Sequence, residues 1–218
     1  MEDPGQVGKT NALLLASRQD IVLLPVSTSL PSSIAALGVD GSGGGYRLRR
    51  ARSGSASVAG ELDVNGDKAV DLAYCEAASI CRVVLGPPVT LATGWEISGF
   101  ARGTRQALLA GGAQLTLRRE SLAVTNDADL DGDGLADVVV ADPTSVYVVR
   151  GRAAGFDPVD LQTFSDGYRI RAATDGTVTS IALIGDMNGD ESPDLAIADE
   201  TADDGAGRVY VVFSVPGG

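Results

Sequence analysis

The sequence predicts an all-β fold built from repeated four-stranded antiparallel units, on the strength of three observations. An acidic pattern of nine residues occurs three times in the 218 residues. A short apolar run follows each copy at once, and a second apolar run lies just beyond a polar turn. The chain also contains 28 Gly residues, and its apolar residues are mainly Val, Leu, Ile and Ala, a mixture that favours strands joined by tight turns.

The acidic pattern reads Asp-x-Asn/Asp-Gly-Asp-x-x-x-Asp and begins at residues 63, 129 and 186. Oxygen-bearing side chains at its positions 1, 3, 5 and 9 suit a hard cation such as Ca²⁺, which takes about six to eight oxygen ligands. We expect the backbone carbonyl at position 7 to complete each site, and the Gly at position 4 to permit the sharp bend. The predicted ligands of three Ca²⁺ sites are Asp63, Asn65, Asp67, Ala69 and Asp71; Asp129, Asp131, Asp133, Leu135 and Asp137; and Asp186, Asn188, Asp190, Ser192 and Asp194.

Position 3 distinguishes the three loops, because it is Asn65 and Asn188 in two of them and Asp131 in the middle one. An Asn ligand lowers the charge of a site, so we expect the middle loop to bind Ca²⁺ most tightly. The carboxylates of the loops also account for much of the net charge of −12. An acidic chain without a broad basic patch is a poor candidate for binding nucleic acid.

The predicted strands recur around the loops, and the third loop lacks the fourth strand of its unit. The strands that precede a loop are 57–59, 122–124 and 181–183, and those that follow it are 72–74, 138–140 and 195–197. After a polar turn come the third strands, at 82–85, 146–149 and 209–212. A pattern of Gly, aromatic, charged and aliphatic residues marks the fourth strands, at 45–48, 94–97 and 167–170. Such alternation is typical of a half-exposed strand at the outer edge of a sheet.

Four antiparallel strands in about sixty residues are the size of one blade of a β-propeller. We therefore predict a single repeat domain, 1–218, with about three and a half blades. Its divisions are a partial blade at 1–50, blades with a calcium loop at 51–100 and 101–171, and a blade at 172–218 that lacks its last strand. The stretch from Trp95 to Asp129 is about twice as long as its counterparts, so the middle blade is expected to contain an insertion at 101–120.

Other families of calcium loops fit less well. An EF-hand needs a bidentate Glu at position 12 and flanking helices, whereas position 12 here is Tyr74, Val140 and Ile197, inside predicted strands. Dockerin loops lead into helices. Thrombospondin type-3 repeats are rich in Cys and lack apolar strands between their loops.

The third unit resembles the FG-GAP repeat of integrin α-subunit propellers and of many bacterial surface proteins. The residues that resemble it are Asp166-Gly167-Tyr168, Gly185 to Asp190, Asp194 to Ala198, and Gly207 to Phe213. The Phe-Gly pair that names the repeat is absent before all three loops. The resemblance covers roughly residues 45–213 and implies a calcium-stabilised propeller whose calcium loops lie on one face. Partners would dock on the opposite face, where the insertion at 101–120 is expected to contact them.

The sequence contains no His, which excludes His general bases, Ser–His and Cys–His nucleophile pairs, and His zinc ligands. We expect no enzyme, but a protein-interaction or cell-adhesion module, with a protein partner or a second chain completing the propeller. Two alternative hypotheses remain. One is a domain of, or appended to, a secreted hydrolase, for which a paired-carboxylate glycosidase stays open. The other is a lectin-like, carbohydrate-binding propeller, in which Trp95 and the tyrosines would stack on sugars.

The two cysteines, Cys75 and Cys81, lie in neighbouring predicted strands. The sequence leaves open whether they form a disulfide or remain two buried thiols. No stretch approaches the roughly 20 apolar residues of a membrane span, and the acidic segment Met1–Gly5 is no signal peptide. We expect an extracellular, cell-surface or periplasmic location, with the signal peptide removed or the chain being a piece of a longer protein.

Overall fold

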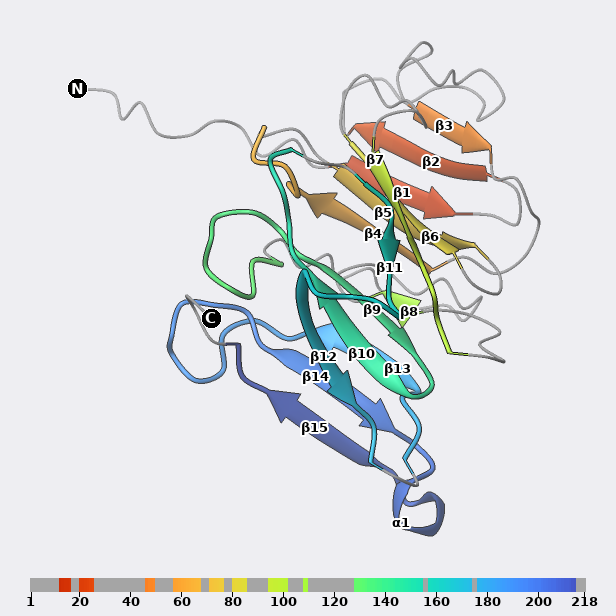
Figure 1. The fold of residues 1–218 in the computed structure, drawn as a ribbon, viewed down its shortest axis with the longest axis vertical. Coiled ribbons are helices and arrows are strands. Elements are labelled where there is room, and N and C mark those ends of the chain that lie inside the picture. Colours follow the sequence, from red (N-terminus) through yellow and green to blue (C-terminus); the bar gives the residue numbers. More distant parts are fainter. Residues whose placement is uncertain are drawn as a thin grey trace.

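The structure is a computed structural model that describes residues 12–16, 20–25, 46–49, 57–67, 71–76, 80–85, 94–101, 108–109, 128–154, 157–173 and 176–214. Within these ranges the chain forms fifteen strands and one short helical turn, α1 (Ala202–Gly205). The strands make four separate sheets, which we name A to D in the order in which they occur along the chain (Figure 1). The prediction of an all-β fold is therefore confirmed.

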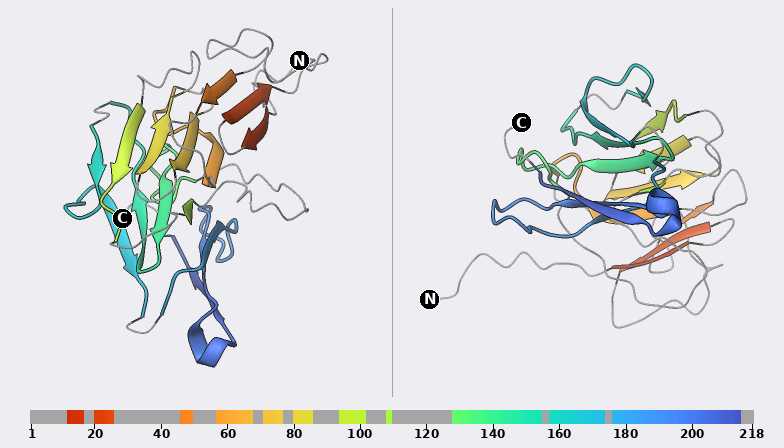
Figure 2. Two further views of the ribbon diagram at one scale, coloured as in Figure 1. Left: turned by 90° about the vertical axis from the view of Figure 1, so that its right-hand side faces the viewer. Right: turned by 90° about the horizontal axis from the view of Figure 1, so that it is seen from below.

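Sheets A and D have three strands each, and sheet A lies at the opposite end of the molecule from sheet D and α1 (Figure 2). Sheet A has the order β1 (Ala12–Ala16), β2 (Asp20–Pro25), β3 (Tyr46–Arg49). Sheet D has the order β13 (Ser180–Leu183), β14 (Leu195–Asp199), β15 (Arg208–Val212). All neighbouring strands in these two sheets are antiparallel.

Sheets B and C lie between them and are larger. Sheet B has the order β11 (Val159–Asp160), β7 (Gly94–Ser98), β6 (Ile80–Val84), β5 (Asp71–Glu76), β4 (Ser57–Leu62). Sheet C has the order β12 (Gly167–Arg171), β10 (Ser145–Val149), β9 (Val138–Asp142), β8 (Leu108–Leu109). All pairs are antiparallel except β7 and β11, which are parallel.

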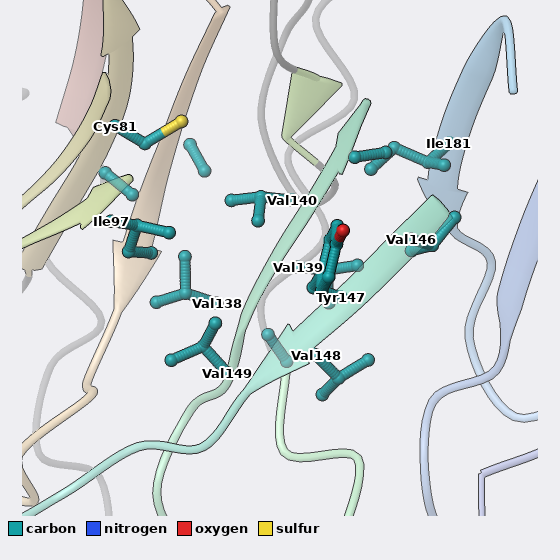
Figure 3. Close-up of a cluster of buried hydrophobic side chains, with 14 of the residues drawn as sticks. Cys81, Ile97, Val138, Val139, Val140, Val146, Tyr147, Val148, Val149 and Ile181 are labelled. Atoms are coloured by element: carbon teal, nitrogen blue, oxygen red, sulfur yellow. The ribbon is translucent and has the colours of Figure 1, made fainter. Parts of the chain in front are cut away.

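The core is centred on β9 and β10, in which every residue is buried. Their nearly continuous Val sequences suit strands that are covered on both faces. Figure 3 shows Val138 and Val149 on the side of Ile97 of sheet B, while Val146 lies on the side of Ile181 of sheet D. Sheet C is thus packed between its two neighbours.

One strand of sheet C differs from the prediction. The strand that pairs with β9 is β8, through Leu108↔Ala141 and Leu109↔Val140, and not the segment 122–124, which lies outside the described residues. The segment 101–120 therefore supplies a sheet strand and is more than an inserted loop. A two-residue strand has no periodicity, so the sequence pattern cannot distinguish it from any other apolar pair.

The outer edges of sheets B and D differ. After β10 the chain crosses to sheet B, where Val159 pairs with Ile97 and the Leu161 N–H donates to the Ser98 carbonyl at 2.9 Å. The edge of β7 is thereby covered. In the described part of the chain no strand pairs with the outer edge of β15.

We find no helix in the described ranges with the length and apolarity that a membrane span requires.

Candidate metal sites in three acidic loops

The three acidic loops lie side by side. Loop one (63–71) touches loop two (129–137), because the Asp63 carbonyl accepts the Ala136 N–H at 2.8 Å. Gly66, with φ of 76°, lies so close to loop two that a Cβ there would be 2.8 Å from Leu135 Cδ2. Loop three (186–194) joins them at a polar cleft of about 380 Å³, which is lined by Asp63, Asp129 and Glu191 among others. The repeat in the sequence thus becomes a cluster in space.

The carboxylate at position 1 organises loops two and three in the same way. Asp129 accepts N–H groups from positions 4, 5 and 6 of its loop, at 2.7, 3.1 and 2.9 Å. Asp186 accepts the same three groups of loop three, at 2.6, 3.2 and 2.9 Å. The N–H groups of Gly189 and then Glu191 are the main reason why the pKa of Asp186 lies below its usual value. The two loops therefore share one hydrogen-bonded conformation.

The side chain at position 3 supports the next turn in every loop by accepting the N–H of position 5. The distances are 3.1 Å for Asn65, 3.2 Å for Asp131 and 3.0 Å for Asn188. Each Asn also donates its amide to the carboxylate at position 5, at 3.0 Å in loop one and 2.9 Å in loop three. Asp133 and Asp190 in turn accept the N–H of position 7. Ala69, the predicted carbonyl ligand of loop one, lies outside the described residues.

The carboxylate at position 9 is buried in all three loops, as Asp71, Asp137 and Asp194. One of its oxygens accepts the N–H of position 2, at 2.9, 3.0 and 2.8 Å respectively. The other oxygen reaches the end of the third strand, where Gly151 donates to Asp137 at 3.0 Å and Ser214 donates to Asp194 at 3.1 Å. Position 9 therefore ties the loop to the sheet that follows it.

Loop two meets the geometric requirement of a metal site. Carboxylate oxygens of Asp129, Asp131 and Asp137 all lie within 4.8 Å of one another. Oxygens around one Ca²⁺ are about 2.3–2.6 Å from the ion, so ligands on opposite sides are about 5 Å apart. Burial raises the pKa of Asp137 to about 7, against the effect of its hydrogen bonds from Gly151 and Leu130. A cation would favour the ionised form of that carboxyl group.

The structure does not bring all predicted ligands into that group. Asp133, at position 5 of loop two, is exposed, and its carboxylate is not among the three grouped ones. Loops one and three have Asn at position 3, and among the described residues only loop two forms a group of three carboxylates. Positions 1, 3 and 9 are thus assembled in loop two, while the remaining predicted ligands stay predictions.

Two further aspartates, Asp142 and Asp199, connect neighbouring sheets at the opposite ends of the strands. The Asp142 carboxylate accepts the N–H and hydroxyl of Thr144 at 2.8 and 2.7 Å, and with its other oxygen the N–H of Ala101 at 2.9 Å. Ala101 follows β7, the last strand of the preceding unit. Asp142 therefore closes its own hairpin turn and holds the chain that arrives from sheet B.

Asp199 repeats this arrangement one unit later. It accepts the N–H and hydroxyl of Thr201 at 2.9 and 2.6 Å, and the N–H of Thr177, which follows β12, at 3.0 Å. The Thr201 hydroxyl is the main reason why the pKa of Asp199 is lowered. Both aspartates lie in the polar turn between the second and third strands of their units, and the sequence analysis did not predict that they link neighbouring sheets. The recurring Asp-x-Thr at 142–144 and 199–201 was the available signal.

Cys75 and Cys81 are cross-strand neighbours in β5 and β6, and the structure joins them by a disulfide. Both residues are fully buried. The bond closes the hairpin between two strands of sheet B.

The fold and the loops together define a class of protein, namely an all-β repeat protein with an acidic loop in front of the second strand of successive sheets. Residues 129–197 match the family model of the FG-GAP-like repeat. The resemblance drawn from the sequence is confirmed for that segment, which runs from the start of loop two into β14. No solved structure matches the chain significantly.

Proposed function

We propose that this chain is a calcium-stabilised β-propeller module, or part of one, that acts in protein interaction or cell adhesion. The observation that supports it most is the grouping of Asp129, Asp131 and Asp137 within 4.8 Å, inside an FG-GAP-like repeat. Bound Ca²⁺ would supply positive charge to carboxylates that otherwise repel one another. The loops themselves fix the ends of strands, so we assign the cation a structural role and the module no catalytic role.

The arrangement of the sheets supports a propeller. The first strands of three successive sheets lie together, since β8 contacts both β4 and β13. β1 in turn contacts β4. Successive antiparallel sheets with their first strands gathered on one side are the arrangement expected of blades around an axis.

We propose that a protein partner or a second copy of the chain completes this arrangement at β15. Val209 is 69% exposed and Phe213 is 53% exposed, in and just after a strand whose outer edge pairs with no strand of the described residues. Proteins rarely leave a long apolar edge strand uncovered, because it recruits other strands. Sedimentation velocity over a range of concentrations tests for a second copy. A strictly monomeric protein would leave a different partner as the occupant of this edge.

Thermal unfolding in Ca²⁺ and in chelator tests the calcium function. A ligand that binds only the native state raises the free energy of unfolding by RT ln(1 + [L]/Kd), which is about 2.7 kcal/mol at a hundredfold excess over Kd. We expect a higher melting temperature in Ca²⁺ than in Mg²⁺ or in chelator, and a smaller difference in Asp131→Ala. Equal melting temperatures in all three conditions would refute the calcium function.

We propose a location outside the cytoplasm. The Cys75–Cys81 disulfide supports this, because disulfides persist in oxidising compartments and are rare in the cytosol. Secretion of the full-length protein from its own cells, followed by thiol labelling after denaturation, tests the location. Retention of the protein inside the cells, with both thiols reactive after denaturation, would contradict the proposal.

A further inference from the structure

A guanidinium group lies against one of the grouped carboxylates of loop two. Arg150 Nε is 3.0 Å from Asp131 Oδ2. Asp131 is buried, with 9% of its surface exposed, so this ion pair is only partly accessible to water. A cation of the protein itself thus lies at a carboxylate to which we assign Ca²⁺.

The backbone around Arg150 is fixed to the acidic loops. Its own N–H donates to the Asp166 carbonyl, and the next residue, Gly151, donates to Asp137 of loop two at 3.0 Å. A Cβ on Gly151 would lie 2.6 Å from the Ala136 carbonyl oxygen, so only Gly fits here. The Arg152 N–H then donates to the Val64 carbonyl of loop one at 2.6 Å. The segment therefore holds the Arg150 side chain at loop two.

Strand register shows which residues occupy the same place in the other two units. The last residue of the third strand pairs with the first residue after the loop in every unit. These pairs are Val84↔Leu72, Val149↔Val138 and Val212↔Leu195. The residue that follows is Leu85 in unit one, Arg150 in unit two and Phe213 in unit three.

The charge of the residue after the third strand varies together with the charge of the side chain at position 3 of the loop. Arg150 occurs in the unit with Asp131, whereas Leu85 and Phe213 occur in the units with Asn65 and Asn188. At positions 1, 3, 5 and 9, loop two has four carboxylates and loops one and three have three each, so Arg150 offsets the one additional carboxylate at these positions of loop two. The additional acid and the base form a matched pair.

We propose that Arg150 is the internal counter-ion of loop two, which neutralises Asp131 in the metal-free protein and competes with Ca²⁺ for that carboxylate. The competition rests on the proposed calcium function, whereas the role as counter-ion does not. Arg150 would offset the gain in affinity that the additional carboxylate gives. Counting carboxylates alone, which predicts the tightest binding at loop two, then overestimates the difference between the loops.

Amide NMR of the Gly at position 4 of each loop gives a separate Ca²⁺ affinity for each site. Gly66, Gly132 and Gly189 report loops one, two and three in a single titration. The Arg150 side chain is 39% exposed, so its ion pair with Asp131 is partly screened by water. We therefore expect Arg150→Gln to tighten the Ca²⁺ affinity reported by the Gly132 signal only about threefold to fivefold. Binding at the other two signals should not change, and Arg150→Lys should stay near the wild-type affinity. Unchanged or weaker binding at Gly132 in Arg150→Gln would overturn the competition.

A second experiment, thermal unfolding in chelator, tests the role of Arg150 as counter-ion in the absence of Ca²⁺. Arg150→Gln should lower the melting temperature of the wild type, but have little effect in an Asp131→Asn background, where there is no carboxylate to neutralise. An equal loss in both backgrounds would overturn the counter-ion role. If no Gly signal responds to Ca²⁺ in wild type or variants, the calcium function and the competition both fail. The comparison of Arg150→Gln in the two backgrounds still tests whether Arg150 neutralises Asp131.

Transplanting the pair to unit three provides the matched gain of function. Phe213 is 53% exposed, so Phe213→Arg should be tolerated. It should weaken Ca²⁺ binding at Gly189, and the addition of Asn188→Asp should restore much of the affinity. Tighter binding at Gly189 in Phe213→Arg alone would contradict the proposal.

Discussion

β10 and β15 contain the same four residues, Val-Tyr-Val-Val, yet they lie in opposite environments. In β10, Val146–Val149, all four are buried, whereas in β15 Val209 is 69% exposed and Tyr210 is 41% exposed. Both strands pair with their neighbours in the same register relative to the preceding loop. The sequence therefore determines that a strand forms, and the surrounding sheets determine whether it is buried.

The difference arises from the neighbours of each strand. β10 is paired on both edges, by β9 and β12, and sheet C has sheets B and D on its two faces. β15 is paired by β14 on one edge, and no described strand pairs with the other. Burying a Val side chain contributes about 1.5–3 kcal/mol. The exposed Val side chains of β15 would contribute this free energy only if another chain covered them. For this reason we propose a partner at β15.

The largest expected effect comes from placing a charge at matched positions of the two strands. Val148→Asp buries an unpaired carboxylate in sheet C and should cost more than about 4 kcal/mol, enough to prevent folding. Val211→Asp, in the same place of β15, should change the free energy of unfolding by less than about 0.5 kcal/mol. Urea unfolding followed by far-UV circular dichroism measures both.

A strong loss of stability in Val211→Asp would show that β15 is covered in solution. Sedimentation velocity of the wild type then identifies whether a second copy is responsible. Equal tolerance of both variants would contradict the burial of β10.

The two aspartates that link neighbouring sheets give the next largest effect. Asp142→Ala leaves the N–H groups of Ala101 and of the buried Ser145 without their acceptor, and should cost about 3 kcal/mol. Asp199→Ala removes the matching bonds at the end of sheet D, where water reaches Thr201, and should cost clearly less. Thermal unfolding in chelator separates these losses from any effect of Ca²⁺. A greater loss in Asp199→Ala would contradict the order of burial in the two sheets.

Much of this architecture follows from local sequence patterns. The strand after each loop, the third strand and the Gly-aromatic strand all appear at the predicted places, because period-two alternation and tight turns are local properties. The folding of each loop on its own carboxylates is equally local. What the pattern missed depends on contacts between distant segments. These are the pairing of β8 with β9, the parallel addition of β11 to β7, and the pairing of Arg150 with Asp131.

The smallest effect concerns position 6 of the loops, which is Gly134 in loop two and Glu191 in loop three. Both have positive φ, 89° and 69°, a conformation that costs a residue with a side chain about 1 kcal/mol. Because Gly also increases the entropy of the unfolded chain, Glu191→Gly should raise the free energy of unfolding by at most about 1 kcal/mol. Gly134→Glu should lower it by a similar amount. Glu191→Gln controls for the lost charge, and chelator keeps Ca²⁺ from contributing. A destabilised Glu191→Gly would mean that loop three does not adopt the conformation of loop two in solution, and that the repeat of loops is less regular than the shared hydrogen bonds imply.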